Sequence, residues 1–358
     1  MEKTTKKVGE PAKFKPAGQT EKKQLLKLGG DGEGPPMPSV AECVAETKAL
    51  GGLYELIDPI DTCAGPIGRF PAVPEALPLH PAIVGFGKRR TGKTYTTRDI
   101  FFHCLRHLPF GIVITRTKVN GFWSTYIPDW LVKNAEEMTH AIDVLIKRQK
   151  KNIAKWKKEH PEQVAENPDA YKNVPELAAF CILDDIISDA AAMMWNTLLT
   201  SLFVEGRHVC ITVVILTQYP KGVGPKIRGN ADIAMIQPMY DWDQVEMMAN
   251  MFNGGMDRKL WRQMMNEVVE DNILPGSTPL ETKKKVRTLF VSDFENTKNP
   301  QIKFHYYEAE DPGPFRLCRP EYWKQQDNAW LNSSAPAKPI DVVEELEEAA
   351  SGNQRMFH

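Results

Sequence analysis

The feature that most constrains the fold is an eight-residue phosphate-loop pattern directly after a short apolar segment. Residues 87–94 read GKRRTGKT and satisfy GxxxxGK[ST]. The glycines let the backbone curl so that its N–H groups point into one concavity, which binds anions. Lys93 would place its charge against the β- and γ-phosphates, and the Thr94 hydroxyl is suited to ligate Mg²⁺. The sequence predicts a nucleoside triphosphate site formed by Gly87, Lys88, Arg89, Arg90, Thr91, Gly92, Lys93 and Thr94.

Four apolar segments rich in Val, Ile and Thr predict buried strands. They are PAIVGFG (81–87), FGIVITRT (110–117), AAFCILDD (178–185) and VCITVVILTQ (209–218). None alternates cleanly with polar residues, and continuous apolar runs of this length are typical of strands covered on both faces of a parallel sheet.

Helical patterns separate these segments, at 93–107, 135–159 and 190–206. Strands that alternate with helices indicate an α/β fold. We expect a helical pair at 242–271, and then an edge hairpin formed by KVRTLFVSD and QIKFHYYEA.

Two of the apolar segments end in polar residues, Asp184-Asp185 and Thr217-Gln218. Ligands of α/β sheets bind at the carboxyl ends of parallel strands. We therefore assign Asp184 to Mg²⁺, directly or through water, and Asp185 to the attacking water. Gln218 would touch the γ-phosphate or align that water. Taken alone, the acid pair also fits a solvated turn.

The order of these segments indicates which kind of phosphate-loop protein this is. A phosphate-loop strand, one intervening strand, the Asp-Asp strand and then the polar-tipped strand fit ATPases that have an additional central strand. The simpler arrangement of nucleotide kinases fits less well.

Composition excludes several classes of protein. The 358 residues carry a net charge of -1, with 42% hydrophobic and 25% charged residues, as in globular proteins rather than disordered, collagenous or coiled-coil chains. The longest apolar run, around Val209–Leu216, is too short to span a bilayer, and MEKTTKKVGE lacks the apolar core of a secretory signal. Six scattered cysteines indicate reduced thiols rather than a disulfide framework or zinc site. We expect a soluble intracellular protein.

The chain divides by composition into four parts. Residues 1–38 read as a flexible basic tail and 39–78 as an N-terminal extension packed on the core. The core would span 79–310, and 311–358 would form a C-terminal segment whose tail contains the acidic stretch DVVEELEEAASGN.

Several blocks of the core resemble a known family. GKRRTGKT, FCILDD and GRHVCITVVILTQ are similar to the genome-packaging ATPases of large double-stranded DNA viruses (poxvirus-type), which belong to the FtsK–HerA superfamily of DNA-pumping motors. NGFWSTYIPDWLV, KIRGNADIAMI and the final KFHYYEAE also resemble that family. The resemblance covers roughly residues 79–310, and the Arg-His pair before a strand that ends in Gln is more specific than the phosphate loop.

The resemblance implies a RecA-like ATPase core with a mainly parallel central sheet, a helical insertion and a C-terminal β-hairpin. It implies a ring, a hexamer or pentamer, around double-stranded DNA, with ATP and Mg²⁺ between subunits and capsid proteins as further partners. The setting would be the host cytoplasm or the virion. Lys93 and Thr94 match the Walker A residues, Asp184 the metal carboxylate of Walker B, Asp185 the water-activating acid and Gln218 the sensor. Many relatives have Glu at the second acidic position, where this chain has Asp185, whose side chain is one methylene shorter.

Basic residues supply candidates for two further roles. A ring ATPase needs an arginine that reaches the neighbour's γ-phosphate, and Arg207 and Arg228 are the candidates, with Arg207 preferred. Each also fits an ordinary surface ion pair. Lys221 and Lys226 would face DNA. The basic segment IKRQKKNIAKWKKEH fits a solvated helix better than a DNA contact.

The aromatic and methionine stripe within 242–265 is interpreted as core packing. Its members are Trp242, Met247, Met248, Met251, Phe252, Trp261, Met264 and Met265.

The leading interpretation is an ATPase that couples ATP hydrolysis to packaging of viral DNA. The alternatives are another DNA pump or helicase of the same superfamily, a nucleotide or small-molecule kinase, and a nucleotide-binding scaffold. We find no arginine-bearing lid of the kind that a kinase would need, and the presence of all four residues Lys93, Thr94, Asp184 and Asp185 disfavours a scaffold.

Overall fold

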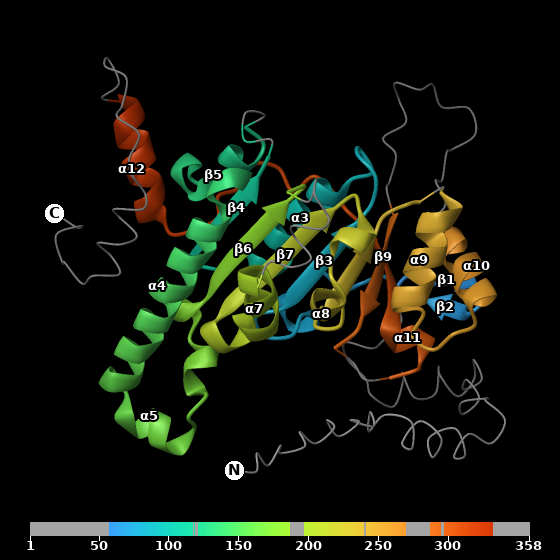
Figure 1. Ribbon diagram of the computed structural model, residues 1–358, viewed down its shortest axis with the longest axis horizontal. Helices are drawn as coiled ribbons and strands as arrows, with labels where there is room; N and C mark the ends of the chain where they lie inside the picture. The colour runs from blue at the N-terminus through green and yellow to red at the C-terminus, as the bar shows by residue number, and fades with distance from the viewer. Residues whose placement is uncertain are drawn as a thin grey trace, which may run out of the picture. The chain divides into compact units, whose positions relative to one another are not determined.

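The computed structural model describes residues 57–116, 118, 121–186, 197–239, 241–269, 287–294 and 297–331 (Figure 1). All of them belong to one compact unit, Pro38–His358. The two predicted tails, 1–38 and most of the acidic C-terminal segment, lie outside the described residues.

An eight-stranded sheet forms the centre, in the order β10-β9-β8-β3-β7-β6-β4-β5. Its strands are β3 (Ala82–Phe86), β4 (Phe110–Thr115), β5 (Val132–Asn134), β6 (Ala179–Asp184), β7 (Ile211–Thr217), β8 (Ile233–Ile236), β9 (Arg287–Ser292) and β10 (Phe304–Glu308). The pairs from β8 to β5 are parallel, whereas β9 is antiparallel to both β8 and β10. The predicted α/β class, the mainly parallel sheet and the C-terminal hairpin at its edge are confirmed.

Strand β7 lies between the phosphate-loop strand β3 and the Asp-Asp strand β6. The predicted additional central strand is therefore present. The short strands β5 and β8 were not among the predicted strands, because runs of three and four residues are too short to show a period.

The helices cover both faces of the sheet. They are α3 (Lys93–Ile100), continued by the π-helical η3 (Phe101–Leu105), α4 (Met138–Glu159), α5 (Pro161–Glu166), α7 (Thr197–Glu205), α8 (Pro225–Arg228), α9 (Trp242–Phe252), α10 (Arg258–Val269), α11 (Pro300–Lys303) and α12 (Pro320–Leu331). The helical insertion is α4 with α5, which follows β5 and precedes β6. The predicted helical pair within 242–271 is confirmed as α9 and α10.

Strand register shows that η3 and α4 lie on opposite faces. Phe110 pairs with Ala179 and Gly111 with Phe180, so the Phe110 and Phe180 side chains point to opposite faces of the sheet. Phe180 packs against Phe101 of η3, whereas Phe110 packs under Arg148 of α4. Because both faces are covered, residues such as Ile112, Phe180 and Val214 are fully buried, which explains the continuous apolar runs.

Residues 57–78 pack on the antiparallel end of the sheet. They contain a small antiparallel pair, β1 (Ile60–Thr62) and β2 (Gly65–Ile67). The Phe70 ring lies 4.7 Å from that of Phe290 in β9, and its N–H donates to the Tyr306 carbonyl of β10 at 2.8 Å. Across the described part of the chain, every helix is too short or too polar to cross a membrane.

Candidate nucleotide site

The phosphate loop connects the end of β3 to the start of α3. Gly92 adopts a left-handed conformation (φ 101°) where the loop enters the helix, which favours glycine. At Gly87 a Cβ atom would come within 2.6 Å of the Gln237 Cβ and of the Thr91 hydroxyl, so only glycine fits. The Gly87 N–H donates to the Thr217 carbonyl at 3.2 Å, which fixes the loop against β7.

Lys93 lies inside this loop. Its Nζ donates to the carbonyls of Gly87 at 2.7 Å and Lys88 at 2.8 Å, and the residue is only 7% exposed. Burial lowers the pKa of Lys93, and the carboxylates of Asp185 and Asp184 oppose that shift. The loop thus holds an ammonium group whose hydrogen-bond partners are neutral carbonyls.

The second wall of the site is the carboxyl end of β6. The Thr94 hydroxyl lies 3.4 Å from Asp184 Oδ1 and 3.3 Å from Oδ2, and the indole Nε1 of Trp123 donates to Oδ2 at 2.8 Å. Burial raises the pKa of Asp184, opposed chiefly by the Trp123 hydrogen bond. A hydroxyl and a carboxylate at this distance are hard oxygen donors of the kind that Mg²⁺ takes, so the residues present fit that ion.

Asp185 and Gln218 meet next to Asp184. The Gln218 amide donates to both Asp185 carboxylate oxygens, at 2.7 and 2.5 Å. Asp185 itself has a positive φ of 54°, and its N–H donates to the Leu216 carbonyl of β7. The strand order therefore brings Lys93, Thr94, Asp184, Asp185 and Gln218 to one edge of the sheet.

The two candidate arginines lie away from this edge. Arg207 is exposed in η10 (Gly206–Val209), at the opposite end of β7 from Gln218. Arg228 ends α8, where it donates to the Val223 carbonyl of its own connection, and burial lowers its pKa. Lys221 and Lys226 are exposed in the connection from β7 to β8.

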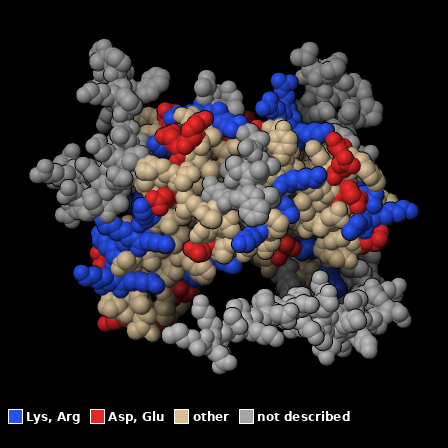
Figure 2. Space-filling model, in the orientation of Figure 1, with Lys and Arg blue, Asp and Glu red and all other residues tan. Residues whose placement is uncertain are grey.

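The basic segment forms part of α4, and Lys and Arg gather over that helix in Figure 2. Several of its basic residues have partners within the chain. The Arg148 guanidinium lies 3.9 Å from the Phe110 ring centroid, and Lys147 pairs with Asp143 at 2.7 Å. This agrees with a solvated outer helix.

The interpretation of 242–265 as core holds for part of the stripe. Met248, Phe252, Trp261, Met264 and Met265 are buried, but Trp242 is 64% exposed. Met247 and Met251 are half-buried. The prediction is wrong for Trp242, which is the first residue of α9 and whose ring lies 4.5 Å from the Arg262 guanidinium of α10 rather than in the core.

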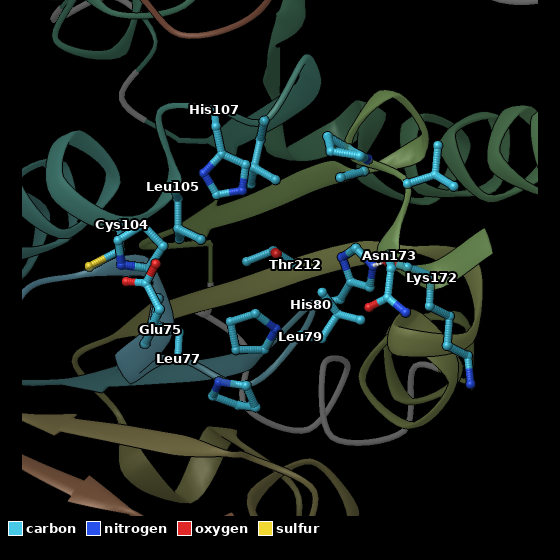
Figure 3. A pocket seen from close by; sticks show the side chains of 17 residues that line it. Glu75, Leu77, Leu79, His80, Cys104, Leu105, His107, Lys172, Asn173 and Thr212 are labelled. Atoms are coloured by element: carbon cyan, nitrogen blue, oxygen red, sulfur yellow. Dashed lines mark hydrogen bonds between the residues drawn. The ribbon is translucent and has the colours of Figure 1, made fainter. Parts of the chain in front are cut away.

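A separate cavity of about 320 Å³ lies near the amino ends of the same strands (Figure 3). In the view shown, His80 and Asn173 lie on one side and Glu75 and Cys104 on the other, with Thr212 between them. The His80 Nε2–H donates to the Lys172 carbonyl at 2.9 Å, and burial lowers the pKa of His80. None of the predicted site residues lines this cavity.

Two residues of the site escaped the sequence analysis. Trp123 follows β4 in the segment NGFWSTYIPDWLV, which the sequence analysis named only for its family resemblance, and only its contact with Asp184 reveals its place in the site. Gln237 follows β8, which was not predicted as a strand. Its amide donates to the hydroxyls of Thr96 (3.1 Å) and Thr288 (2.9 Å), and its Cβ closes the space behind Gly87. The sequence signal that could have indicated Gln237 is its position directly after a short apolar run.

Part of the chain is similar in sequence to proteins of two viruses. No protein-family model matches it. It is 32% identical over 157 residues to protein L437 of Acanthamoeba polyphaga mimivirus, covering 43% of this chain and 51% of that protein. The chain spans about half the length of the curated relatives that it matches.

Two solved structures illustrate its likeness in three dimensions. The pCW3 conjugation coupling protein TcpA, in its monomer form with ATPγS, has a TM-score of 0.43 and 13% identity over 64% of this chain and 60% of that chain. The genome packaging NTPase B204 from Sulfolobus turreted icosahedral virus 2, in complex with AMPPCP, has a TM-score of 0.39 and 11% identity. The match covers 65% of this chain and 100% of that chain. At these TM-scores the fold assignment rests on the chain's own strand order.

Proposed function

We propose that this chain is an Mg²⁺-dependent ATPase of the FtsK–HerA type that translocates double-stranded DNA and packages a viral genome into a capsid. One observation carries the ATPase chemistry: Lys93, Thr94 and Asp184 come together at the carboxyl ends of the central parallel strands. The proposal of DNA packaging rests in addition on the family-like blocks that surround these residues.

Lys93 and the loop amides bind the triphosphate. Nζ now bonds two neutral carbonyls, whereas phosphate oxygens carry negative charge, so that both partners of the hydrogen bond would be ionised. Lys93 therefore exchanges its loop partners for the β- and γ-phosphates. Thr94 and Asp184 hold Mg²⁺, which when bound neutralises charge on the transferring phosphoryl group.

Asp185 orients the attacking water and accepts its proton. The Gln218 amide donates to both of its carboxylate oxygens, and each oxygen keeps a lone pair that can accept a hydrogen bond from the water. Gln218 then remains beside the acid and fixes its orientation.

An arginine from the neighbouring subunit completes the site in the proposed ring. Arg207 is exposed and lies at the other end of β7 from its own Gln218, so it is free to serve a neighbour; Arg228 is the second candidate. We expect Arg207→Ala to retain ATP binding and lose turnover. Mixing it with Lys93→Ala subunits should partly restore turnover, and absence of any rescue would argue against a role in the neighbouring subunit.

Lys221 and Lys226 contact DNA phosphates in this proposal, since both are exposed in the connection that directly follows Gln218. Contacts to phosphates make DNA binding strongly salt-dependent. The proposed setting is the virion or the host cytoplasm, with capsid proteins as docking partners.

The deciding experiment compares the ATPase rate with and without double-stranded DNA and measures the particle mass in solution. DNA-stimulated turnover by a ring supports the translocase. A monomer indifferent to DNA that transfers phosphate to a small acceptor indicates a kinase, and nucleotide binding without hydrolysis indicates a scaffold. Packaging, as opposed to another DNA pump, requires that a Lys93→Ala virus assemble capsids that lack DNA.

A further inference from the structure

We propose that Trp123 is a positioning residue that orients the Asp184 carboxylate for the metal ion; this inference rests on the proposed nucleotide site. Trp123 begins the short helix η5 (Trp123–Thr125), which lies between β4 and β5. The residue is 4% exposed, and its indole Nε1 donates to Asp184 Oδ2 at 2.8 Å.

The hydrogen bond from the Trp123 indole is the shortest of the described side-chain contacts of the Asp184 carboxylate. The Thr94 hydroxyl lies 3.3 and 3.4 Å from the two carboxylate oxygens, beyond the usual range for an O–H···O hydrogen bond. The terminal torsion of an aspartate is broad and roughly two-fold, so a carboxylate without a directional partner samples many orientations. The Trp123 N–H selects one of them and leaves Oδ1 available to another ligand.

Trp123 is itself firmly held. Its carbonyl accepts hydrogen bonds from the N–H groups of Tyr126 and Ile127, both at 2.9 Å, and Phe122 packs edge-on against its ring. The Tyr126 hydroxyl accepts a hydrogen bond from Arg98 of α3 at 2.9 Å. The segment that presents the indole is therefore fixed to the same helix that carries Lys93 and Thr94.

An indole suits this task chemically. Its N–H only donates and does not ionise, so it cannot compete with Asp184 as a metal ligand or introduce a second charge. The ring also forms one wall of a hollow of about 190 Å³ beside Asp184, which includes Thr94, Thr115 and Lys118. A variant that removes the N–H and keeps an aromatic ring at position 123 therefore distinguishes two roles of Trp123: orienting the Asp184 carboxylate and lining the hollow.

The test is Trp123→Phe, with Trp130→Phe as the matched control. The Trp130 indole lies apart from the site, with Nε1 3.5 Å from the Tyr322 carbonyl. Binding of a fluorescent, non-hydrolysable ATP analogue is measured against Mg²⁺ concentration and in EDTA. Groups that orient a metal ligand typically contribute 10- to 100-fold to metal affinity. We expect Trp123→Phe to raise the half-maximal Mg²⁺ concentration about tenfold and to leave binding in EDTA unchanged, with Trp130→Phe like the parent.

Two outcomes overturn the inference. One is an unchanged Mg²⁺ dependence in Trp123→Phe; the other is an equal loss of binding with and without Mg²⁺, which would make Trp123 a wall only. If the parent chain binds no nucleotide at all, the proposed function fails instead, and the two failures are distinguishable.

A second measurement needs no variant at Trp123. In the parent chain labelled with ¹⁵N-tryptophan, Mn²⁺ with the analogue should broaden one indole N–H signal far more than the others, because Trp123 alone among the described tryptophans donates to Asp184. Uniform broadening of all indole signals, or none, contradicts the assignment.

Discussion

Helix α3 carries buried charges in two regions that differ in their partners. In its first turn, Lys93 bonds only loop carbonyls, and Thr94 makes a long contact to Asp184. Further along, Asp99 is 1% exposed, and its Oδ2 accepts hydrogen bonds from the Tyr307 hydroxyl at 2.6 Å and the Glu310 N–H at 3.0 Å. Both regions hold ionisable groups out of water, which is costly without partners.

The difference between the partners of Lys93 and Asp99 indicates which buried charge serves the proposed site and which stabilises the fold. The partners of Asp99 Oδ2 are supplied by β10 and the residues just after it, so this group joins α3 to the antiparallel end of the sheet, while Oδ1 lies 3.4 Å from His103 Nε2. The partners of Lys93 are neutral groups that a phosphate can replace. Buried charge with replaceable partners marks the site, whereas buried charge with short, specific partners supports the fold.

The largest expected effect is that of Lys93→Ala. We expect ATP turnover to fall about 1,000-fold, because a preorganised cation at the transferring phosphate is lost. The unfolding temperature should change little, since the two lost hydrogen bonds are offset by no longer holding an ammonium group out of water. The control is Lys88→Ala, which keeps the loop backbone that Lys88 contributes to the site and removes only a half-exposed side chain that lies 3.9 Å from Asp241, so it should matter little to turnover. Equal effects of both variants would break the comparison.

Asp185→Asn should reduce turnover about 100-fold, the contribution typical of a general base. Nucleotide binding should persist, because Lys93, Thr94 and Asp184 remain. Steady-state hydrolysis and equilibrium binding of the analogue, measured on the same preparation, check this. Loss of binding in parallel with turnover would place Asp185 among the metal or phosphate ligands instead.

Around Asp99, Tyr307→Phe should lower the free energy of unfolding by about 1–3 kcal/mol, because it leaves the buried Oδ2 of Asp99 with one hydrogen-bond partner fewer. Turnover per folded molecule should stay the same. The control is Tyr306→Phe, whose hydroxyl donates to the neutral Asp58 carbonyl at 2.6 Å and should contribute less. Denaturant unfolding followed by tryptophan fluorescence gives both values.

The smallest effect concerns pH. Burial lowers the pKa of His305, on β10, from 6.5 to about 4. The unfolded chain therefore binds this proton more readily, so the stability from neutral His305 is complete above pH 6.5 and falls as the pH drops toward 4. From pH 6.5 to about 5.5 the loss should be about 1 kcal/mol. His305→Leu should reduce this slope; an unchanged slope would assign the acid sensitivity to other groups.

Much of the site follows from the sequence because its chemistry needs fixed residue types at fixed spacing. The phosphate loop and the acid pair at the end of an apolar run are local patterns, and the parallel register then brings them together. Trp123 and Gln237 do not follow, because their roles depend on contacts with residues 61 and 141 positions away in the chain, Asp184 and Thr96 respectively.

The fold was predictable to a similar degree. Long buried strands such as β6 and β7 are evident in the sequence, whereas β5 and β8 are too short to show a pattern and are defined by their neighbours. The exposure of Trp242 was missed for a related reason. Its apolar side chain fits the helical stripe, but as the first residue of α9 it lies beyond the part of the helix that is packed.

The central claim is that Lys93 and Asp184 hold one magnesium–triphosphate between them. Calorimetric titration with a non-hydrolysable ATP analogue, in Mg²⁺ and in EDTA, tests it most directly on the parent chain and on Asp184→Asn. We expect one nucleotide per chain, bound more tightly in Mg²⁺ than in EDTA, and loss of that difference in Asp184→Asn. Binding that is indifferent to Mg²⁺, or a gain that survives in Asp184→Asn, would contradict it.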